Sequence, residues 1–409
     1  MTEEIKSRIE QIKAGQVPEG YKQVHSGTIP VDWNEATISN IADEITDTAG
    51  EGEYETLSIS AGIGFVNQAQ KFGREKSGAQ YAKYTVLHRG DFSYNKGNSN
   101  LYPQGCIYRL NDRKEAAVPN VFESFRFTAQ DGDYYEQLFV NGFLNKQLYS
   151  KINHGVRDDG LLNLTGSDFY SCCLPVPPLP EQKKIAEILR QCDKVIELKQ
   201  SKIEELQELK KTCLSKMFPK EGHNVPELRF SGFTDAWEQR KLGAVCAEFK
   251  SGDFIRAKDI GVAGAYPVFG GNGLRGYTDR HNHDGDYALI GRQGALCGNM
   301  NYSSGKAYFT EHAVAVKANT LNETLFLFYR LGTMNLGQYS GQSAQPGLAV
   351  GNLVELETML PLKEEQRQIG VYFYNLDHLI TLHQRELEET QKYKKALMQL
   401  LLMGIVRVK

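Results

Sequence analysis

One stretch of the sequence combines side chains that can bind phosphates, hydrogen-bond to base edges and stack on bases. Residues 71–114 hold nine Lys and Arg against three Asp and Glu, a surplus of +6. Its basic, amide and tyrosine residues include Tyr81, Tyr84, Tyr94, Asn95, Lys96, Asn98, Tyr102, Arg109 and Arg113. This mixture favours a local nucleic-acid site.

A second stretch pairs basic residues with glycine. Residues 240–280 hold seven Lys and Arg against four Asp and Glu, and glycine-rich runs occupy residues 269–280 and 289–302. Glycine lets the backbone approach a ligand closely, and Arg275, Arg292 and Gln293 could form bidentate bonds with guanine or adenine. Turns between strands with a solvated charged face would explain these residues equally well.

Catalytic motifs are not found in the sequence. Gly305-Lys306 is followed by Ala307, so no phosphate-binding P-loop is formed, and neither a flipped-base methyltransferase motif nor a glycine-rich cofactor fingerprint occurs. His281 and His283 form one H-x-H without a third ligand, which favours a surface turn over a metal site. The sequence therefore predicts no enzyme and no bound metal or cofactor.

Composition sets the broad class. The 409 residues favour two or more domains, and 47 basic against 50 acidic residues give a net charge of -3, so any nucleic-acid site must be local. The charged start MTEEIKSRIE and the lack of a run of about 20 apolar residues predict a cytoplasmic protein without a membrane contact. Seven cysteines without C-x-x-C predict reduced, mostly buried thiols.

An internal repeat organises the elements that carry these residues. Residues 181–218 align without a gap on residues 365–402, with twelve of 38 positions identical. Neither segment contains proline, and proline precedes each, so each predicts one helix of roughly 57 Å at 1.5 Å per residue.

Both predicted helices carry a heptad seam with polar residues at shared positions, which favours their pairing with each other as an antiparallel coiled coil. The residues predicted to pair the helices or dock a partner are Leu189, Ile196, Ile203, Leu206, Phe373, Leu376, Ile380, Leu387 and Leu397. The alternative is two amphipathic helices that each cover their own domain.

A second repeat precedes each region between the helices. Residues 13–19 (KAGQVPE) resemble residues 220–227 (KEGHNVPE), and Trp33 and Trp237 follow them. The short helix expected at residues 3–14 would complete the C-terminal helix, giving a pseudo-two-fold cyclic arrangement.

The expected fold class is α+β, with two mixed α/β domains and two long helices. Its predicted divisions are 1–28, an N-terminal helix and lead-in; 29–173, the first variable region; 174–222, the central helix; 223–359, the second variable region; and 360–409, the C-terminal helix.

These features resemble the specificity subunit of type I restriction-modification enzymes. The segments that carry the resemblance are residues 174–188 (LPVPPLPEQKKIAEI), 360–369 (LPLKEEQRQI), 225–245, 269–277 and 341–348 (GQSAQPGL). The resemblance implies that each variable region is a target-recognition domain for one half of a split, asymmetric DNA sequence. It also implies that the helices set the spacing and dock two methyltransferase subunits.

The resemblance assigns the chemistry to partners of this chain. Methyltransferase subunits would bring S-adenosylmethionine and methylate adenine N6, and restriction subunits would bring ATP-driven cleavage with Mg²⁺. By position in the motifs, the candidate readers of double-stranded DNA are Asn95, Lys96, Asn98, Arg157, Asn163, Asn272, Arg275, Tyr277, Arg292, Gln293 and Gln345. The rival interpretations are a self-sufficient DNA methyltransferase or nuclease, a coiled-coil scaffold that binds protein, and an inactive or silent recombination-locus copy.

Overall fold

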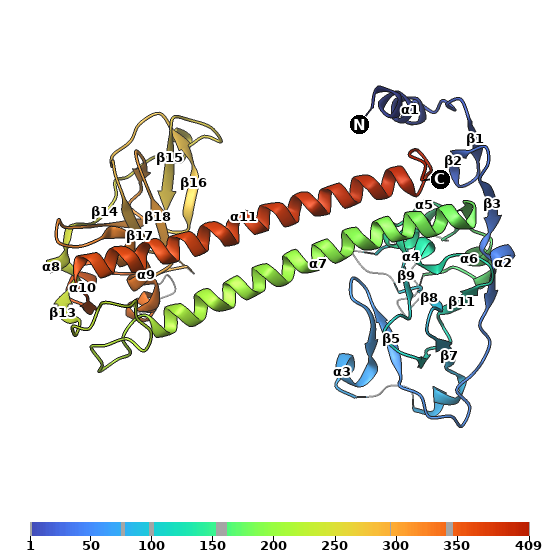
Figure 1. Cartoon of the computed structure of the whole chain (residues 1–409), viewed down its shortest axis with the longest axis horizontal. Coiled ribbons are helices and arrows are strands. Elements are labelled where there is room, and N and C mark those ends of the chain that lie inside the picture. The colour runs from blue at the N-terminus through green and yellow to red at the C-terminus, as the bar shows by residue number, and fades with distance from the viewer. Residues whose placement is uncertain are drawn as a thin grey trace. The chain divides into compact units, whose positions relative to one another are not determined.

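The structure is a computed structural model that describes residues 2–74, 78–97, 102–152, 162–294, 296–340 and 347–408 (Figure 1). The chain divides into two compact units. Unit 1 consists of residues 1–197 and 388–409, and unit 2 of residues 198–387. Each unit thus contains a variable region together with part of both long helices, and the domain boundaries drawn from the sequence stay a prediction.

The two long helices begin and end within two residues of the predicted bounds. They are α7 (Leu179–Lys216) and α11 (Lys363–Leu401). Of the seam residues, Ile196 and Leu397 are half-buried and the others are buried, namely Leu189, Ile203, Leu206, Phe373, Leu376, Ile380 and Leu387. A polar seam residue, Lys199, forms an ion pair with Glu386 at 2.7 Å in unit 2. The predicted helices are therefore confirmed.

The N-terminal segment of unit 1 packs beside the end of the chain. It comprises α1 (Glu3–Lys13) and a hairpin of β1 (Tyr21–Val24) and β2 (Gly27–Pro30). Arg8 donates to the carbonyl of Ile405, and the Tyr21 hydroxyl donates to the carbonyl of Gly404 at 2.7 Å. These bonds join the two ends of the sequence within one unit.

Unit 1 is built on a four-stranded antiparallel sheet in the order β4-β11-β8-β9. Its strands are β4 (Ala42–Glu44), β8 (Phe92–Asn95), β9 (Cys106–Arg109) and β11 (Glu123–Phe127). Its helices are α2 (Ile38–Ile41), α4 (Gly132–Val140), α5 (Asn145–Lys151) and α6 (Gly166–Tyr170). Aromatic side chains fill the core, where the rings of Tyr94 and Phe169 stack 4.7 Å apart.

Smaller β-elements flank this sheet. They are the pair β3 (Asn34–Thr37) and β12 (Cys173–Val176), the hairpin β5 (Leu57–Ser60) and β6 (Gly64–Asn67), and the pair β7 (Thr85–His88) and β10 (Glu115–Val118). The helix α3 (Gln68–Phe72) and the 3₁₀ turn η1 (Gly78–Lys83) follow the hairpin in the chain.

Unit 2 has an equivalent four-stranded sheet in the order β14-β20-β17-β18. Its strands are β14 (Cys246–Ser251), β17 (Tyr287–Gly291), β18 (Met300–Ser303) and β20 (Ala313–Ala318). Its helices are α8 (Leu242–Val245), α9 (Thr324–Thr333) and α10 (Val350–Val354), and its 3₁₀ turns are η2 (Ala257–Asp259) and η3 (Leu336–Tyr339). The other strands are β13 (Glu238–Lys241), which pairs with β21 (Glu357–Leu360), and β15 (Tyr266–Gly270), which lies between β16 (Gly273–Thr278) and β19 (Tyr308–Phe309).

The two variable regions therefore share one topology although their sequences barely resemble each other. In both, a short helix (α2 or α8) leads into an edge strand (β4 or β14). The strand beside it in the sheet (β11 or β20) is the last of the four in the chain, and the longest helix of the region (α4 or α9) follows that strand. The variable regions differ in the hairpins and loops that connect these shared elements.

Residues 132–151 form two helices, α4 and α5, because Gly142 between them adopts a left-handed backbone with φ +69°. One detail differs from the sequence expectations. His283 is not in a surface turn: its side chain is buried, stacks on Phe309 at 4.4 Å and contacts Glu248 at 3.0 Å. Burial lowers the pKa of His283 despite that carboxylate.

The cysteines are unpaired thiols, as predicted, and Cys106, Cys172 and Cys213 are buried while the other four are half-buried. Burial raises the pKa of Cys106 to about 11, so this thiol stays neutral. Among the described helices, none has the length and apolar character needed to cross a membrane.

Candidate nucleic-acid interface

The second-region candidates gather around the hairpin of β15 and β16 in unit 2. Asn272 is exposed at its turn, Arg275 is exposed on β16, and Tyr277 is half-buried on the same strand. A Cβ added at Gly291 would lie 2.3 Å from the carbonyl oxygen of Gly271, so only glycine permits this approach. The close contact brings the hairpin turn beside the start of the loop that follows β17.

Arg292 and Gln293 begin that loop and differ in exposure. The Arg292 guanidinium donates to the carbonyl of Leu348 and to the Ser251 hydroxyl, both at 3.3 Å. Its own carbonyl accepts from the Leu348 amide at 2.9 Å. Arg292 thus holds three chain segments together, whereas Gln293 is exposed beside the hairpin turn.

Lys96 occupies the corresponding place in unit 1, directly after β8. Its ammonium contacts Glu123 at 2.8 Å, and its carbonyl accepts from the Leu162 amide at 2.9 Å. The Asn95 side chain accepts from the Gly97 amide at 2.9 Å and so shapes the same turn. Asn163 is exposed. Lys96 and Arg292 therefore make equivalent backbone hydrogen bonds, and the charged group of each binds other residues of its own unit.

Three candidate readers, Asn98, Arg157 and Gln345, lie outside the described residues. For all candidates, direct contact with DNA stays a prediction.

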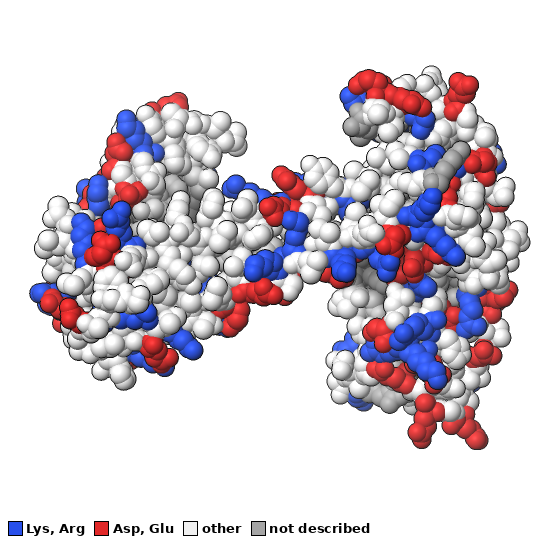
Figure 2. All heavy atoms as spheres, viewed as in Figure 1, with Lys and Arg blue, Asp and Glu red and all other residues white. Residues whose placement is uncertain are grey.

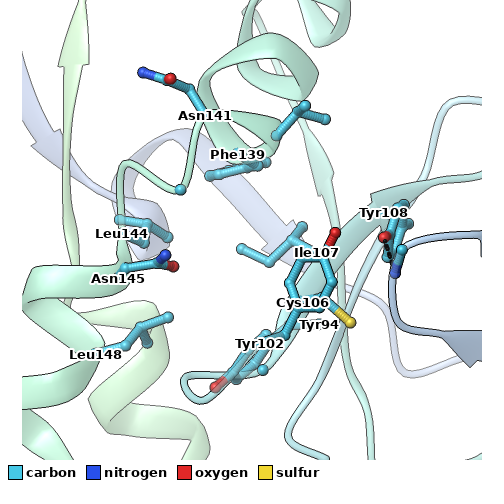
Figure 3. Close-up of a pocket in the computed structure, with 14 residues that line it drawn as sticks. Tyr94, Tyr102, Cys106, Ile107, Tyr108, Phe139, Asn141, Leu144, Asn145 and Leu148 are labelled. Carbon is cyan, nitrogen blue, oxygen red and sulfur yellow. Dashed lines mark hydrogen bonds between the residues drawn. The ribbon is translucent and has the colours of Figure 1, made fainter. Parts of the chain in front are cut away.

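A pocket of about 350 Å³ lies beside the β8–β9 connection of unit 1 (Figure 3). Figure 3 shows Leu144, Asn145 and Leu148 on one side, facing Ile107 and the tyrosines of the sheet. The Tyr108 hydroxyl accepts from the Gly62 amide at 2.9 Å and so ties the tip of the β5–β6 hairpin to β9. No motif in the sequence marks Tyr108 or Asn145 as lining this pocket, because they look like an ordinary core tyrosine and an ordinary amide on a helix surface.

Much of the predicted basic stretch is paired within the chain. Arg109 contacts Asp133 and Glu136, and Arg113 contacts Glu55. Figure 2 shows basic and acidic side chains interleaved over unit 1. The surplus of +6 counted in the sequence is therefore partly neutralised by acids from outside the stretch. Within the described residues, no cluster of His, Cys, Asp and Glu could hold a metal ion.

The Glu-Gln dipeptide at the start of each long helix forms hydrogen bonds that link the helix to the variable region. Gln182 donates to the Pro177 carbonyl at 2.8 Å and accepts from the amide of Asp131, the residue that caps α4, at 2.9 Å. In unit 2, Gln366 makes the same bonds with Pro361 at 2.9 Å and with the amide of Glu323, the residue before α9, at 3.0 Å.

The glutamate of each dipeptide is a buried acceptor for arginine. Glu181 accepts from Arg407 at 2.8 Å and from the Trp33 indole at 2.9 Å, and Glu365 accepts two bonds from Arg229, both at 2.7 Å. Burial opposes the charge of Glu181, but the hydrogen bonds from Arg407 and Trp33 bring its pKa below the ordinary value. The motif therefore marks a structural junction.

Comparison with known families defines the class of protein. A family model described as the type I restriction modification DNA specificity domain matches residues 30–208 and 234–392. These two matches cover most of the chain, which therefore belongs to this family and is a type I restriction-modification specificity subunit.

Individual relatives agree with this assignment. The specificity subunit of the type I restriction enzyme EcoprrI from Escherichia coli is 43% identical over 146 residues, which span 35% of this chain and 36% of that protein. The putative MjaX specificity subunit from Methanocaldococcus jannaschii is 24% identical over 439 aligned positions, which span 96% of this chain and 97% of that protein.

Solved structures share the fold. The S subunit of a type I restriction-modification system from M. genitalium has a TM-score of 0.61 at 18% identity, with 90% of this chain and 96% of that one covered. A chain from a structure of complex assembly in the type I R-M system has a TM-score of 0.53 at 16% identity, with 92% and 99% covered.

Proposed function

We propose that this chain recognises the DNA target of a type I restriction-modification complex, with each variable region reading one half of a bipartite, asymmetric sequence. The observation that carries the proposal is one sheet topology in two units with different residues at equivalent loop positions. The exposed candidate side chains differ as well, with Asn163 in unit 1 and Asn272 and Arg275 in unit 2. Because side chains on such loops decide base contacts, unlike loops imply unlike half-sites.

The proposal includes a coiled coil of α7 and α11 with pseudo-two-fold symmetry. Two observations support it: seam residues that lie 184 positions apart are buried in both helices, and ion pairs join the two helices inside each unit. Asp193 pairs with Lys394 in unit 1, and Asp377 pairs with Lys210 in unit 2. Each aspartate is the repeat equivalent of the other, and so is each lysine.

Exposed apolar side chains recur at repeat-equivalent positions and support docking of two methyltransferase subunits. Val195, Leu198 and Leu209 on α7 correspond to Leu379, Leu382 and Tyr393 on α11, and these six are 41% to 69% exposed. At 100° per residue the three positions fall on one helix face. Apolar patches of this kind are typical of protein interfaces.

Docking through these patches predicts a change in stoichiometry. Leu198→Asp should reduce the number of bound methyltransferase subunits from two to one, as should Leu382→Asp, and the double variant should bind none. The measurement is sedimentation of the purified complex. Val262→Asp, a substitution at a side chain 99% exposed in the second variable region, is the control and should leave both subunits bound.

In this proposal the chain is not an enzyme by itself, and S-adenosylmethionine, ATP and Mg²⁺ bind to the methyltransferase and restriction subunits. The decisive experiment maps N6-methyladenine across a host genome with and without the gene. The expected result is the loss of one split, non-palindromic motif on deletion. If every methylated motif persists, the proposal is wrong.

A protein-binding scaffold is the competing function, and DNA binding discriminates between the two. The proposed function predicts that the complex is retained on duplex DNA and released steeply as salt rises, because phosphate contacts displace counterions. Retention that does not change with salt would favour the scaffold.

A further inference from the structure

One aspartate in each long helix accepts bonds from two other elements of its unit. In unit 1, Asp193 Oδ1 accepts from Lys394 of α11 and Asp193 Oδ2 accepts from Gln137 of α4 at 3.1 Å. In unit 2, Asp377 Oδ1 accepts from Lys210 of α7 at 2.5 Å and Asp377 Oδ2 accepts from the Tyr329 hydroxyl of α9 at 2.8 Å. Each carboxylate thus binds the other long helix with one oxygen and the variable region with the other.

The donors from the variable regions stand at the same helical position. Gln137 lies six residues after Asp131, whose amide binds Gln182, and Tyr329 lies six residues after Glu323, whose amide binds Gln366. The two acceptors on each long helix, the glutamine and the aspartate, lie eleven residues apart.

Two attachment points constrain a helix more than one does. The apolar core packs α4 and α9 against the long helices, and the Tyr134 hydroxyl of α4 also donates to the Leu402 carbonyl. With one polar bond at its N-terminus, each helix could still change direction on that apolar surface more easily than with two. A second bond six residues along, roughly 9 Å at 1.5 Å per residue, fixes the direction of the helix axis relative to the long helix. The sheet that packs beside α4 or α9 is held by the apolar core, and these two bonds add a directional constraint to it.

The chemistry of these contacts favours a role in specificity over a role in stability. Asp193 and Asp377 have side chains that are 36% and 37% exposed, and ion pairs at such positions contribute little to stability. Their partners, Lys394 and Lys210, stand at seam positions, and polar groups that interrupt an apolar seam specify its register. The donor changes from an amide in Gln137 to a phenol in Tyr329, yet the bond to the aspartate is kept.

We propose that Asp193 and Asp377 are positioning residues that hold each variable region in one direction on the helix pair and thereby fix the number of base pairs between the half-sites. This inference rests on the proposed function. A variable region free to swing would reach its half-site over a range of spacings, while the bases it reads would stay the same.

The test uses the full chain assembled with its methyltransferase subunits and a library of split sites. The half-sites are those of the wild-type chain, and the spacer is the wild-type length n, n − 1 or n + 1. For Asp377→Ala, methylation at n − 1 and n + 1 relative to n should rise about tenfold over wild type. Asp193→Ala should have the same effect, with the half-site bases unchanged in both.

Tyr329→Phe removes only the bond between α9 and Asp377. It leaves the ion pair of Asp377 with Lys210 and the bond of the Glu323 amide to Gln366. It should raise the relative methylation at n − 1 and n + 1 about fivefold. Tyr308→Phe is the matched control, because the Tyr308 hydroxyl donates to the Phe254 carbonyl at 3.0 Å within the variable region. This control should keep the wild-type spacer preference.

An unchanged spacer preference in both Asp377→Ala and Tyr329→Phe, in complexes that still methylate, overturns the positioning role and leaves the proposed function intact. An equal broadening in Tyr308→Phe also overturns it, because general loosening would then explain the effect. If the wild-type chain directs methylation to no split site at any spacing, the proposed function fails and the inference fails with it. If Asp377→Ala does not fold, Tyr329→Phe decides the outcome.

Discussion

Two arginines of the second variable region that look alike in the sequence differ in what their guanidinium groups contact. Arg275 is exposed on β16, whereas Arg292 donates to Leu348 and Ser251. Arg275→Ala should therefore weaken binding to one half-site by about 1 to 3 kcal/mol without lowering the melting temperature. Binding is measured on duplexes that vary one half-site at a time, and Lys306→Ala serves as an exposed control.

A loss of affinity that is uniform over all sequences would instead identify Arg275 as a phosphate contact. In that case the slope of affinity against salt should also fall by about one. Relaxed discrimination at one base pair with an unchanged salt slope would identify it as a base reader.

Lys96 combines a predicted reading role with an observed ion pair. Lys96 and Glu123 are 16% and 14% exposed, so Lys96→Ala leaves a mostly buried carboxylate without its cation. The variant should lose about 2 kcal/mol of unfolding free energy, measured by urea denaturation. Replacing both residues, as Lys96→Met with Glu123→Leu, should recover most of that loss. If the double variant binds DNA normally, Lys96 is not a reader.

Residue type alone could not separate readers from structural residues. Lys96 and Arg292 have the right chemistry and lie in motif loops, but their partners, Glu123 and Ser251, are 27 and 41 residues away in the sequence. Such partners become visible only when the strands are paired. Asn272 and Arg275, in contrast, are exposed on a hairpin within the glycine-rich run, where the sequence left close approach to a ligand and turns between strands as alternatives.

At the scale of elements, each unit has, among the described residues, a buried glutamate paired with an arginine, Glu181 with Arg407 and Glu365 with Arg229. Each unit also has one buried tryptophan, and Trp33 in unit 1 donates to Glu181. Arg407→Ala leaves Glu181 buried with only the Trp33 indole and the Val408 amide. Unit 1 should lose about 3 kcal/mol. Trp33 fluorescence in a Trp237→Phe background measures this loss, because these are the only tryptophans in the chain.

The matched variant Arg229→Ala removes the partner of Glu365 in unit 2. In a Trp33→Phe background, it should destabilise the unfolding transition that Trp237 reports. In a Trp237→Phe background, it should leave the unfolding transition that Trp33 reports unchanged. Equal losses in both transitions for either variant would contradict the assignment of one junction to each unit.

The Glu181 junction also predicts a dependence on pH. The folded pKa of Glu181 lies below its ordinary value of 4.5, so its charge stabilises the fold above that pH. This contribution is lost as the pH falls through the lowered folded pKa. The difference in unfolding free energy between wild type and Glu181→Gln should therefore shrink below about pH 4.5. A difference that stays constant or grows toward acid would rule out this role for the charge.

The long helices could be predicted from the sequence to within two residues, whereas the shared sheet could not. Proline before each helix, the heptad seam and the 184-residue repeat are local signals, and they agree with one another. The order β4-β11-β8-β9 depends on pairing strands from distant parts of the chain. The equivalent sheet of unit 2 could not be predicted from sequence similarity either, because packing requires apolar side chains at equivalent places and not the same residues.

At the scale of the whole molecule, the proposed coiled coil predicts that the lengths of α7 and α11 set the number of base pairs between the two half-sites. Asp193 and Lys210 lie 17 residues apart on α7, as do Asp377 and Lys394 on α11. One heptad inserted between the two residues in both helices keeps the seam in phase and adds about 10 Å. At 3.4 Å per base pair this equals about 3 base pairs, so the preferred spacer should lengthen by that amount.

The reason both helices must change lies in the reciprocal ion pairs. A heptad added to α7 alone shifts Lys210 away from Asp377 if Asp193 keeps its bond to Lys394, so one of the two pairs must break. The single insertion should therefore lower methylation at every spacer, whereas the double insertion should restore it at a single longer one. Methylation mapping of both variants against wild type measures this. A double insertion that still selects the wild-type spacer would show that the helices do not set the distance between half-sites.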